Sequence, residues 1–244
     1  MTDDLLQKFT TDSVPGHPNL QPRDAATLIL LDRSGPAPKV LMGKRHQGLT
    51  FLPGGYVFPG GRVDPVDRKM VPGAPLDPRA EAKLMKATRR PSPLKARALA
   101  LAAVRETFEE TGLLLGTKET RPPAAPDGPW SAFADAMVHP DLSTMHFIAR
   151  AVTPPRRVRR YDTRFFTMDA SAIAHKIEGK VGPDAELVEL VWLPLADIKQ
   201  HIQLMVITEI VLKDLMAQID EGFSHDLPVP YYHVVHGKRV RDLL

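Results

Sequence analysis

Cysteine is absent from this chain of 244 residues. Its absence excludes disulfide bonds, thiolate metal sites and a cysteine nucleophile, and it fits a reducing compartment. Long apolar runs are also missing: none approaches the roughly 20 residues that span a bilayer, and the segment MTDDLLQKFT has acids where a signal peptide has basic residues. We therefore expect no membrane partner and a cytoplasmic location.

Aromatic residues are scarce as well, at 6% of the chain. RNA binding or decapping uses exposed aromatic rings that stack on bases, so this composition disfavours a nucleic-acid partner. The histidines show no paired spacing typical of a zinc site, which disfavours transition-metal chemistry.

What the chain does contain is typical of a globular protein: 43% hydrophobic and 25% charged residues, with a net charge of +3. The calculated isoelectric point is nevertheless about 9.1. Basic residues gather between 156 and 164 and again between 238 and 241. These clusters suit an anionic ligand, and a solvated basic surface is the plain alternative.

The sequence divides into an N-terminal arm at 1–22, a main body at 23–222 and a C-terminal tail at 223–244 that has the turn residues of a hairpin. Apolar and β-branched runs predict strands at 25–31, 39–43, 56–58, 144–152, 164–168 and 187–193. Helical spacing predicts helices at 80–88, 94–111, 130–138, 195–202 and 205–219. The proline-rich stretch 68–93 is expected to be an insertion over the surface and a candidate lid. The arm or the tail hairpin is a candidate surface for a homodimer.

The strongest chemical signal lies at the end of the helix expected at 94–111. Glu106, Glu109 and Glu110 are spaced i, i+3 and i+4, so one helical turn brings three carboxylates to one face. Their mutual repulsion, and their unfavourable place at the negative end of the helix dipole, are costly unless a cation neutralises them. A dense set of oxygen ligands suits a hard ion such as Mg²⁺ or Mn²⁺.

A second fragment, Gly60 to Asp67, lies upstream of this helix. Gly60 and Gly61 follow a proline and allow the backbone to approach a neighbouring group closely. For Asp67 we favour a turn residue over a metal ligand, because the Asp-Pro-Val-Asp sequence makes a good turn.

Together the two fragments resemble the Nudix box, whose pattern is Gly, five residues, Glu, seven residues, and then Arg-Glu-apolar-x-Glu-Glu-x-Gly-apolar. Arg105, Glu106, Glu109, Glu110, Gly112 and Leu113 match its second half, with Thr107 at the position that is usually apolar. In the first half Gly61 matches, but Asp67 replaces Glu, and 37 residues (68–104) stand where the pattern has seven.

One branch of the Nudix family, which includes enzymes similar to peroxisomal coenzyme A diphosphatases, carries such an insertion within the box. This chain resembles that branch over about 25–200, through its segments 57–64, 108–114, 153–154 and 162–166. The resemblance implies an α/β fold, an α/β/α sandwich around a mixed sheet. The 23–222 body would then be the Nudix hydrolase domain.

The resemblance also implies roles for individual residues. The metal ligands would be Glu106, Glu109 and Glu110, with a backbone carbonyl of Gly60 or Gly61. Glu106 would also be a candidate general base, and Arg105 would pair with a carboxylate to hold the cluster in register. A further acid outside the box would be Glu186 or Glu189, and we favour Glu186. As candidate substrate-binding residues we expect Arg45, Arg160 and Arg164, with a salt bridge to Asp162 or a solvated strand edge as the alternative for Arg160 and Arg164.

These features predict metal-dependent hydrolysis of a phosphoanhydride in a nucleoside diphosphate linked to another moiety. Coenzyme A or acyl-coenzyme A is the expected small-molecule nucleotide substrate. ADP-ribose, NADH and dinucleoside polyphosphates are the alternatives within the same chemistry. A catalytically silent Nudix module that senses a nucleotide is the alternative of a different class.

Overall fold

The structure, a computed structural model, describes residues 18–50, 52–196, 198–202 and 204–244. Most of the N-terminal arm therefore lies outside the described residues. Within them, no helix is long and apolar enough to cross a membrane.

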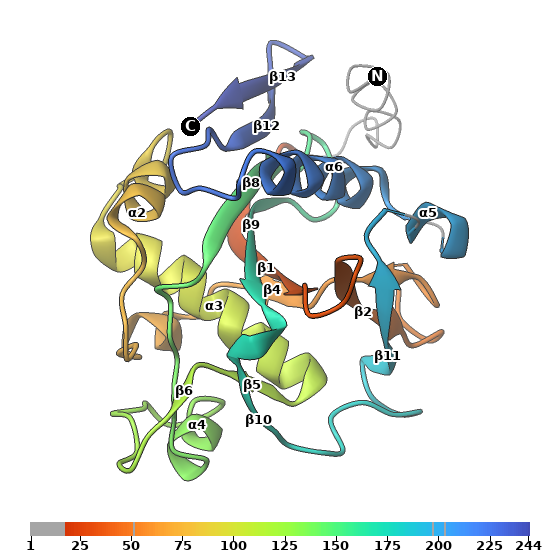
Figure 1. Cartoon of the computed structure of the whole chain (residues 1–244). Coiled ribbons are helices and arrows are strands. Elements are labelled where there is room, and N and C mark those ends of the chain that lie inside the picture. The colour runs from red at the N-terminus through yellow and green to blue at the C-terminus, as the bar shows by residue number, and fades with distance from the viewer. Residues whose placement is uncertain (1–17, 51, 197, 203) are drawn as a thin grey trace.

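A mixed sheet of nine strands forms the centre of the molecule, with strand order β11-β2-β1-β9-β8-β12-β13 (Figure 1). Its strands are β1 (Arg23–Asp32), β2 (Lys39–Arg45), β3 (Tyr56–Val57), β4 (Gly60–Arg62), β8 (His146–Val152), β9 (Tyr161–Asp169), β11 (Leu187–Pro194), β12 (Pro230–Val235) and β13 (Lys238–Leu243). The pairs β1·β9 and β8·β12 are parallel and the others are antiparallel. Two small two-stranded sheets lie beside it: β5 (Leu113–Leu115) with β10 (Ile173–Lys176), and β6 (Thr117–Lys118) with β7 (Val138–His139).

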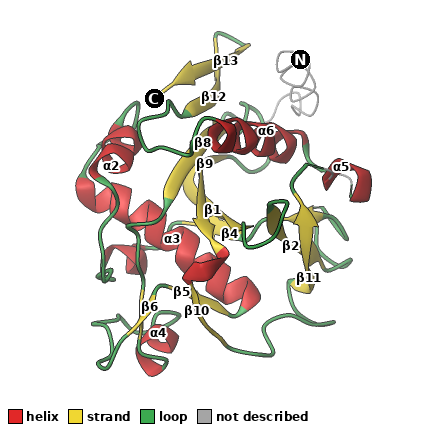
Figure 2. Ribbon diagram, in the orientation of Figure 1, coloured by secondary structure: helices red, strands yellow, loops and turns green. Residues whose placement is uncertain are grey.

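Helices cover both faces of this sheet (Figure 2). They are α2 (Pro78–Met85), α3 (Pro93–Thr111), α4 (Ser131–Asp135), α5 (Ile198–His201) and α6 (Val206–Asp220). Alternate residues of β1 separate two cores, because successive side chains of a strand point to opposite faces. Leu28 and Leu30 pack in the core that contains α3, whereas Ile29 and Leu31 pack in the core that contains α6. The predicted α/β/α sandwich around a mixed sheet is confirmed.

Strands β1 and β2 diverge from a shared end, and the chain fills the space between them with two short strands. β1 pairs β2 only at Leu31 and Asp32, while its first half pairs β4. β3 pairs β2 near Gly43. Between β3 and β4, at Phe58 and Pro59, the chain changes its pairing from β2 to β1.

The helix α3 agrees with the helix predicted at 94–111, and both of its ends have local capping signals. The Ser92 side chain accepts a hydrogen bond from the Lys95 amide at 3.1 Å, and Pro93 occupies the first turn. Gly112 ends the helix in the left-handed region, at φ 78°, and donates its N–H to the Phe108 carbonyl at 2.8 Å.

The insertion at 68–93 is packed more deeply than the sequence suggested. Met70, Leu76, Ala80 and Leu84 are all buried and belong to the core around α3. The expectation of a segment that only lies over the surface is wrong, because these apolar side chains anchor it beneath the surface. The tail hairpin is present as β12 and β13, and it extends the main sheet through β8.

Candidate active site

The C-terminal end of α3 carries the three carboxylates, and two of them lie against β4. Gly61 lies directly against Glu106: a Cβ atom at this glycine would be 2.5 Å from the Glu106 carboxyl carbon. A side chain at position 61 would displace the Glu106 carboxylate from this position, so the glycine allows the close approach. The Gly60 amide donates a hydrogen bond to Glu110.

Arg105 organises the cluster from inside the protein. Its guanidinium donates two hydrogen bonds to Asp67, Nε at 2.8 Å and Nη2 at 3.1 Å. Nη1 donates to Glu106 at 3.0 Å and also to Glu109, while Nη2 reaches the Arg62 carbonyl at 2.8 Å. One buried cation thus fixes two of the three carboxylates relative to β4.

Asp67 is the buried counterion of Arg105. Its side chain is fully buried, and besides Arg105 it accepts hydrogen bonds from Trp130 Nε1 at 3.3 Å and from the Asp64 amide at 2.8 Å. Asp67 and Asp64 also form the capping box of a 3-10 turn at Pro65–Arg68. The turn that we expected at Asp67 is present. Asp67 is also the carboxylate partner of Arg105.

Burial raises the pKa of Glu106, although the Arg105 charge acts in the opposite direction. The pKa of Glu110 is raised well above its usual value, first by burial and then by the negative charges of Glu186 and Glu106. Oxygen Oε2 of Glu110 is buried and has no hydrogen-bond partner among the described residues. An ionised carboxylate in this position is costly unless a cation reaches it.

The two acids proposed outside the box occupy different positions. Glu186 precedes β11 and pairs with Arg45 at 2.8 Å, and its charge acts on Glu110. Glu189 is exposed within β11. Arg45, at the end of β2, and Glu186, just before β11, are therefore both close enough to act on the charge of Glu110.

The donor set fits a hard divalent ion, because the partnerless oxygen of Glu110 lies in a group of carboxylates that repel one another. The side chains do not yet enclose one. Across the described ranges, no three acidic or histidine side chains converge closely enough to hold an ion as they stand. In this arrangement Arg105 supplies the positive charge at Glu106 and Glu109.

Two predicted substrate-binding residues lie elsewhere. Arg164 has a side chain only 1% exposed and pairs with Asp24 at 2.8 Å and Asp162 at 3.1 Å. The structure contradicts its assignment to substrate, because a buried guanidinium between two carboxylates is not accessible to a ligand. Arg160 holds the start of the described chain by donating to Asn19 Oδ1 and to the Leu20 carbonyl, each at 2.6 Å.

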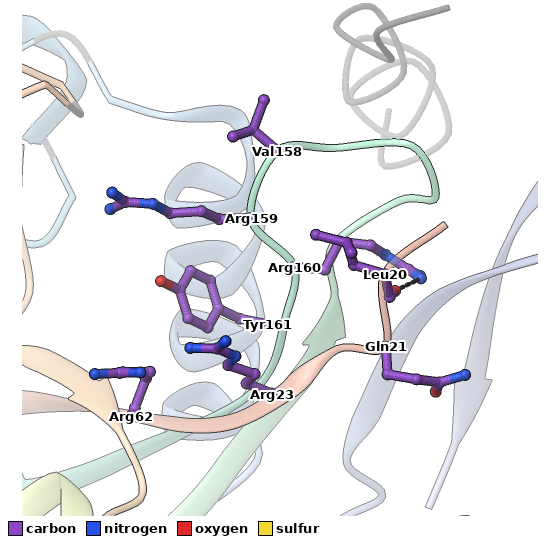
Figure 3. A pocket seen from close by; sticks show the side chains of 8 residues that line it. All are labelled: Leu20, Gln21, Arg23, Arg62, Val158, Arg159, Arg160 and Tyr161. Carbon is purple, nitrogen blue, oxygen red and sulfur yellow. Dashed lines mark hydrogen bonds between the residues drawn. The ribbon is translucent and has the colours of Figure 1, made fainter. Parts of the chain in front are cut away.

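Arg160 also lines a cavity of about 630 Å³ that the sequence did not reveal (Figure 3). Other lining residues are Arg23, Arg62, Arg159 and Tyr161. Arg159 belongs to the basic cluster noted in the sequence, but nothing there connected it with Arg23 and Arg62, which are distant along the chain.

Comparison with known proteins agrees with this architecture. No protein-family model matches the chain. A NUDIX hydrolase of known structure from Alicyclobacillus acidocaldarius is 31% identical, with a TM-score of 0.61, over 85% of this chain and 96% of that one. The acyl-coenzyme A diphosphatase NUDT19 of Gallus gallus is 29% identical over 59% of this chain, and the chain spans about half of that relative, 54% of its length. From the box residues on α3, the glycine against Glu106 and the match over nearly the whole bacterial structure, the chain belongs to the Nudix hydrolase family.

Proposed function

We propose that this chain hydrolyses the diphosphate bond of coenzyme A or an acyl-coenzyme A, with Mg²⁺ or Mn²⁺ held by Glu106, Glu109 and Glu110. The observation that carries this proposal is the partnerless, buried oxygen of Glu110 beside two other acids. Such an arrangement favours a bound cation, and a phosphoanhydride is the group whose hydrolysis a cation there assists. The name of the chicken relative supports coenzyme A as the substrate.

When bound, the ion would withdraw charge from the diphosphate oxygens and lower the pKa of a water molecule. Glu106 is the candidate general base, because it lies in the carboxylate cluster and burial raises its pKa. A water oxygen forms a bond to phosphorus, the anhydride P–O bond breaks, and the proton of the water passes to Glu106. The products are 4′-phosphopantetheine and 3′,5′-ADP.

The other residues position these groups. Arg105 sets the orientation of Glu106 relative to Gly61 through its bonds to Asp67 and the Arg62 carbonyl. Arg45 and Glu186 form an ion pair at the edge of the cluster, where Arg45 is a candidate contact for the substrate diphosphate. Glu186 is the candidate additional acid.

A substrate screen with mass-spectrometric identification of the products tests this proposal. Coenzyme A, acyl-coenzyme A, ADP-ribose, NADH and dinucleoside polyphosphates are each incubated with Mg²⁺ or Mn²⁺, using the natural chain and Glu109→Gln. We expect cleavage of coenzyme A that the variant loses by a factor of roughly 100 or more, as for the removal of one charge-stabilising group. Selective cleavage of another compound would replace the substrate, and no cleavage at all would favour a nucleotide-sensing module.

Two neighbouring acids provide a matched comparison for the additional acid. Glu186→Gln removes a negative charge that acts on Glu110. Glu189→Gln removes the charge of an exposed carboxylate three residues further along the chain. We expect kcat to fall for Glu186→Gln and to stay near its original value for Glu189→Gln. Equal effects of the two changes would remove Glu186 from the site.

A further inference from the structure

The arginine cavity lies at the end of the main sheet where β1 and β9 begin and β4 ends. Strand register pairs Arg23 with Tyr161, and Arg62 with Ala25 two residues further along β1. Figure 3 shows the side chains of Arg23, Arg62 and Arg159 on the same side as the Tyr161 ring. Three guanidinium groups from separate segments are thus brought to one hollow.

Among the residues that the structure describes, those that line this hollow include four arginines and no acid. Within the described residues, Arg23, Arg62 and Arg159 form no ion pair, and the nearby acids Asp24 and Asp162 are already paired with other cations. Guanidinium groups gathered in this way repel one another, and an anion between them relieves that repulsion.

The cavity is close to the carboxylate cluster along the chain. Arg62 directly follows Gly61, the residue that lies against Glu106. Successive residues of a strand point to opposite faces, so the Arg62 side chain and the Glu106 carboxylate lie on opposite sides of β4, at neighbouring positions along the strand. A ligand whose diphosphate lies at the carboxylates therefore passes the end of β4 to reach the arginines.

We propose that Arg23, Arg62 and Arg159 bind a phosphomonoester on the ribose of the nucleotide substrate, with the Tyr161 ring beside it. This inference rests on the proposed function, because it assumes that the diphosphate is held at Glu106, Glu109 and Glu110. A phosphomonoester carries about −1.5 to −2 charges at pH 7 and three acceptor oxygens, which suits several guanidinium groups. ADP-ribose and NADH lack this group, whereas coenzyme A carries it at the 3′ position.

Binding measurements without hydrolysis test the cavity directly. Isothermal titration calorimetry compares 3′,5′-ADP, 2′,5′-ADP and 5′-AMP on the full chain, on Arg159→Gln and on Arg23→Gln. We expect 3′,5′-ADP to bind at least tenfold more tightly than 5′-AMP, and each variant to lose roughly tenfold in affinity for the bisphosphate, as for one hydrogen bond to a charged group. Tighter binding of 2′,5′-ADP would assign the cavity to a 2′-phosphate, a phosphomonoester of the same chemistry.

The control is Arg121→Gln, which removes one exposed arginine outside the cavity and is expected to leave all three affinities unchanged. Thermal unfolding of each variant checks that the replacement leaves the fold intact. Equal affinities for 5′-AMP and both bisphosphates, or bisphosphate affinities that neither cavity variant changes, would overturn the inference.

Hydrolysis of coenzyme A and of 3′-dephospho-coenzyme A separates this inference from the proposed function. We expect kcat/KM to favour coenzyme A at least tenfold, and the ratio to fall toward one in Arg159→Gln. Equal hydrolysis of the two compounds by the natural chain would refute the inference and leave the proposed function intact. Arginine-dependent binding of 3′,5′-ADP with no hydrolysis of either compound would support the cavity and refute the proposed function.

Discussion

Replacement of Asp67 by Asn tests whether the buried ion pair with Arg105 holds the candidate active site together. Asp67 is fully buried and accepts four hydrogen bonds, two of them from Arg105 at 2.8 and 3.1 Å. Asn keeps the size of the side chain but removes the negative charge, so a buried guanidinium loses its main counterion. Removing one partner of a buried pair costs about 3–5 kcal/mol.

Glu106 and Glu109 remain as partners of Arg105. We therefore expect the free energy of unfolding to decrease by about 3 kcal/mol, the lower limit of this range. For a chain of this length that corresponds to a decrease of roughly 6–12 °C in Tm. Urea unfolding and calorimetry measure both quantities. Activity is expected to fall even below the unfolding temperature, because Arg105 no longer fixes Glu106 against Gly61.

The control variant is Asp184→Asn, because Asp184 is exposed and its replacement is expected to change stability by less than about 0.5 kcal/mol. A double-mutant cycle with Arg105→Met isolates the pair, with an expected coupling energy of about 2 kcal/mol. The reasoning fails if Asp67→Asn unfolds like the natural chain, or if the cycle gives no coupling.

Two further predictions concern a close contact and a half-buried imidazole. Gly61→Ala places a methyl group 2.5 Å from the Glu106 carboxyl carbon, so we expect kcat/KM to fall roughly 100-fold through displacement of that carboxylate, whereas Gly35→Ala, at a glycine with open space around it, should have no effect. His146 stacks on His225 with ring centroids 4.0 Å apart, and burial lowers its pKa to about 4. In the unfolded chain the His146 imidazole is protonated near pH 6.5. The free energy of unfolding therefore decreases as the pH falls from about 6.5 toward 4. After allowance for screening by solvent, His146→Phe should recover roughly 1–2 kcal/mol at pH 4.5 relative to pH 7.5; unfolding curves that run parallel at all pH values would contradict this.

The sequence predicted the elements whose signals are local. The apolar pattern at 94–111 predicted a helix, and α3 spans Pro93–Thr111, so the predicted and observed bounds agree within one residue. The carboxylates at the end of that helix could be placed on one face for the same reason. The fold class followed because the box and the surrounding strand pattern both resemble one family.

The arrangement of buried charges was harder to predict, because it depends on contacts between distant segments. Nothing local connects Asp67 with Arg105 across the insertion, and only the folded chain shows that they form a pair. Arg164 is different, because a signal was present. On β9, Arg164 lies on the same face as Phe166 and Met168, which belong to the core around α3. The two-residue period of the strand therefore already placed the Arg164 side chain on a buried face.

The parallel pairing of β1 with β9 has a consequence for how the chain folds. Nine consecutive residue pairs, from Arg23 with Tyr161 to Leu31 with Asp169, join segments that are synthesised far apart in time. Until residue 169 has left the ribosome, β1 has one unpaired edge in the middle of the future sheet, and unpaired strand edges promote aggregation. Contacts of such high sequence separation also slow folding. Fragments that end before Tyr161 should therefore require chaperones. Once β9 is synthesised, it pairs with β1 and covers the exposed edge of that strand.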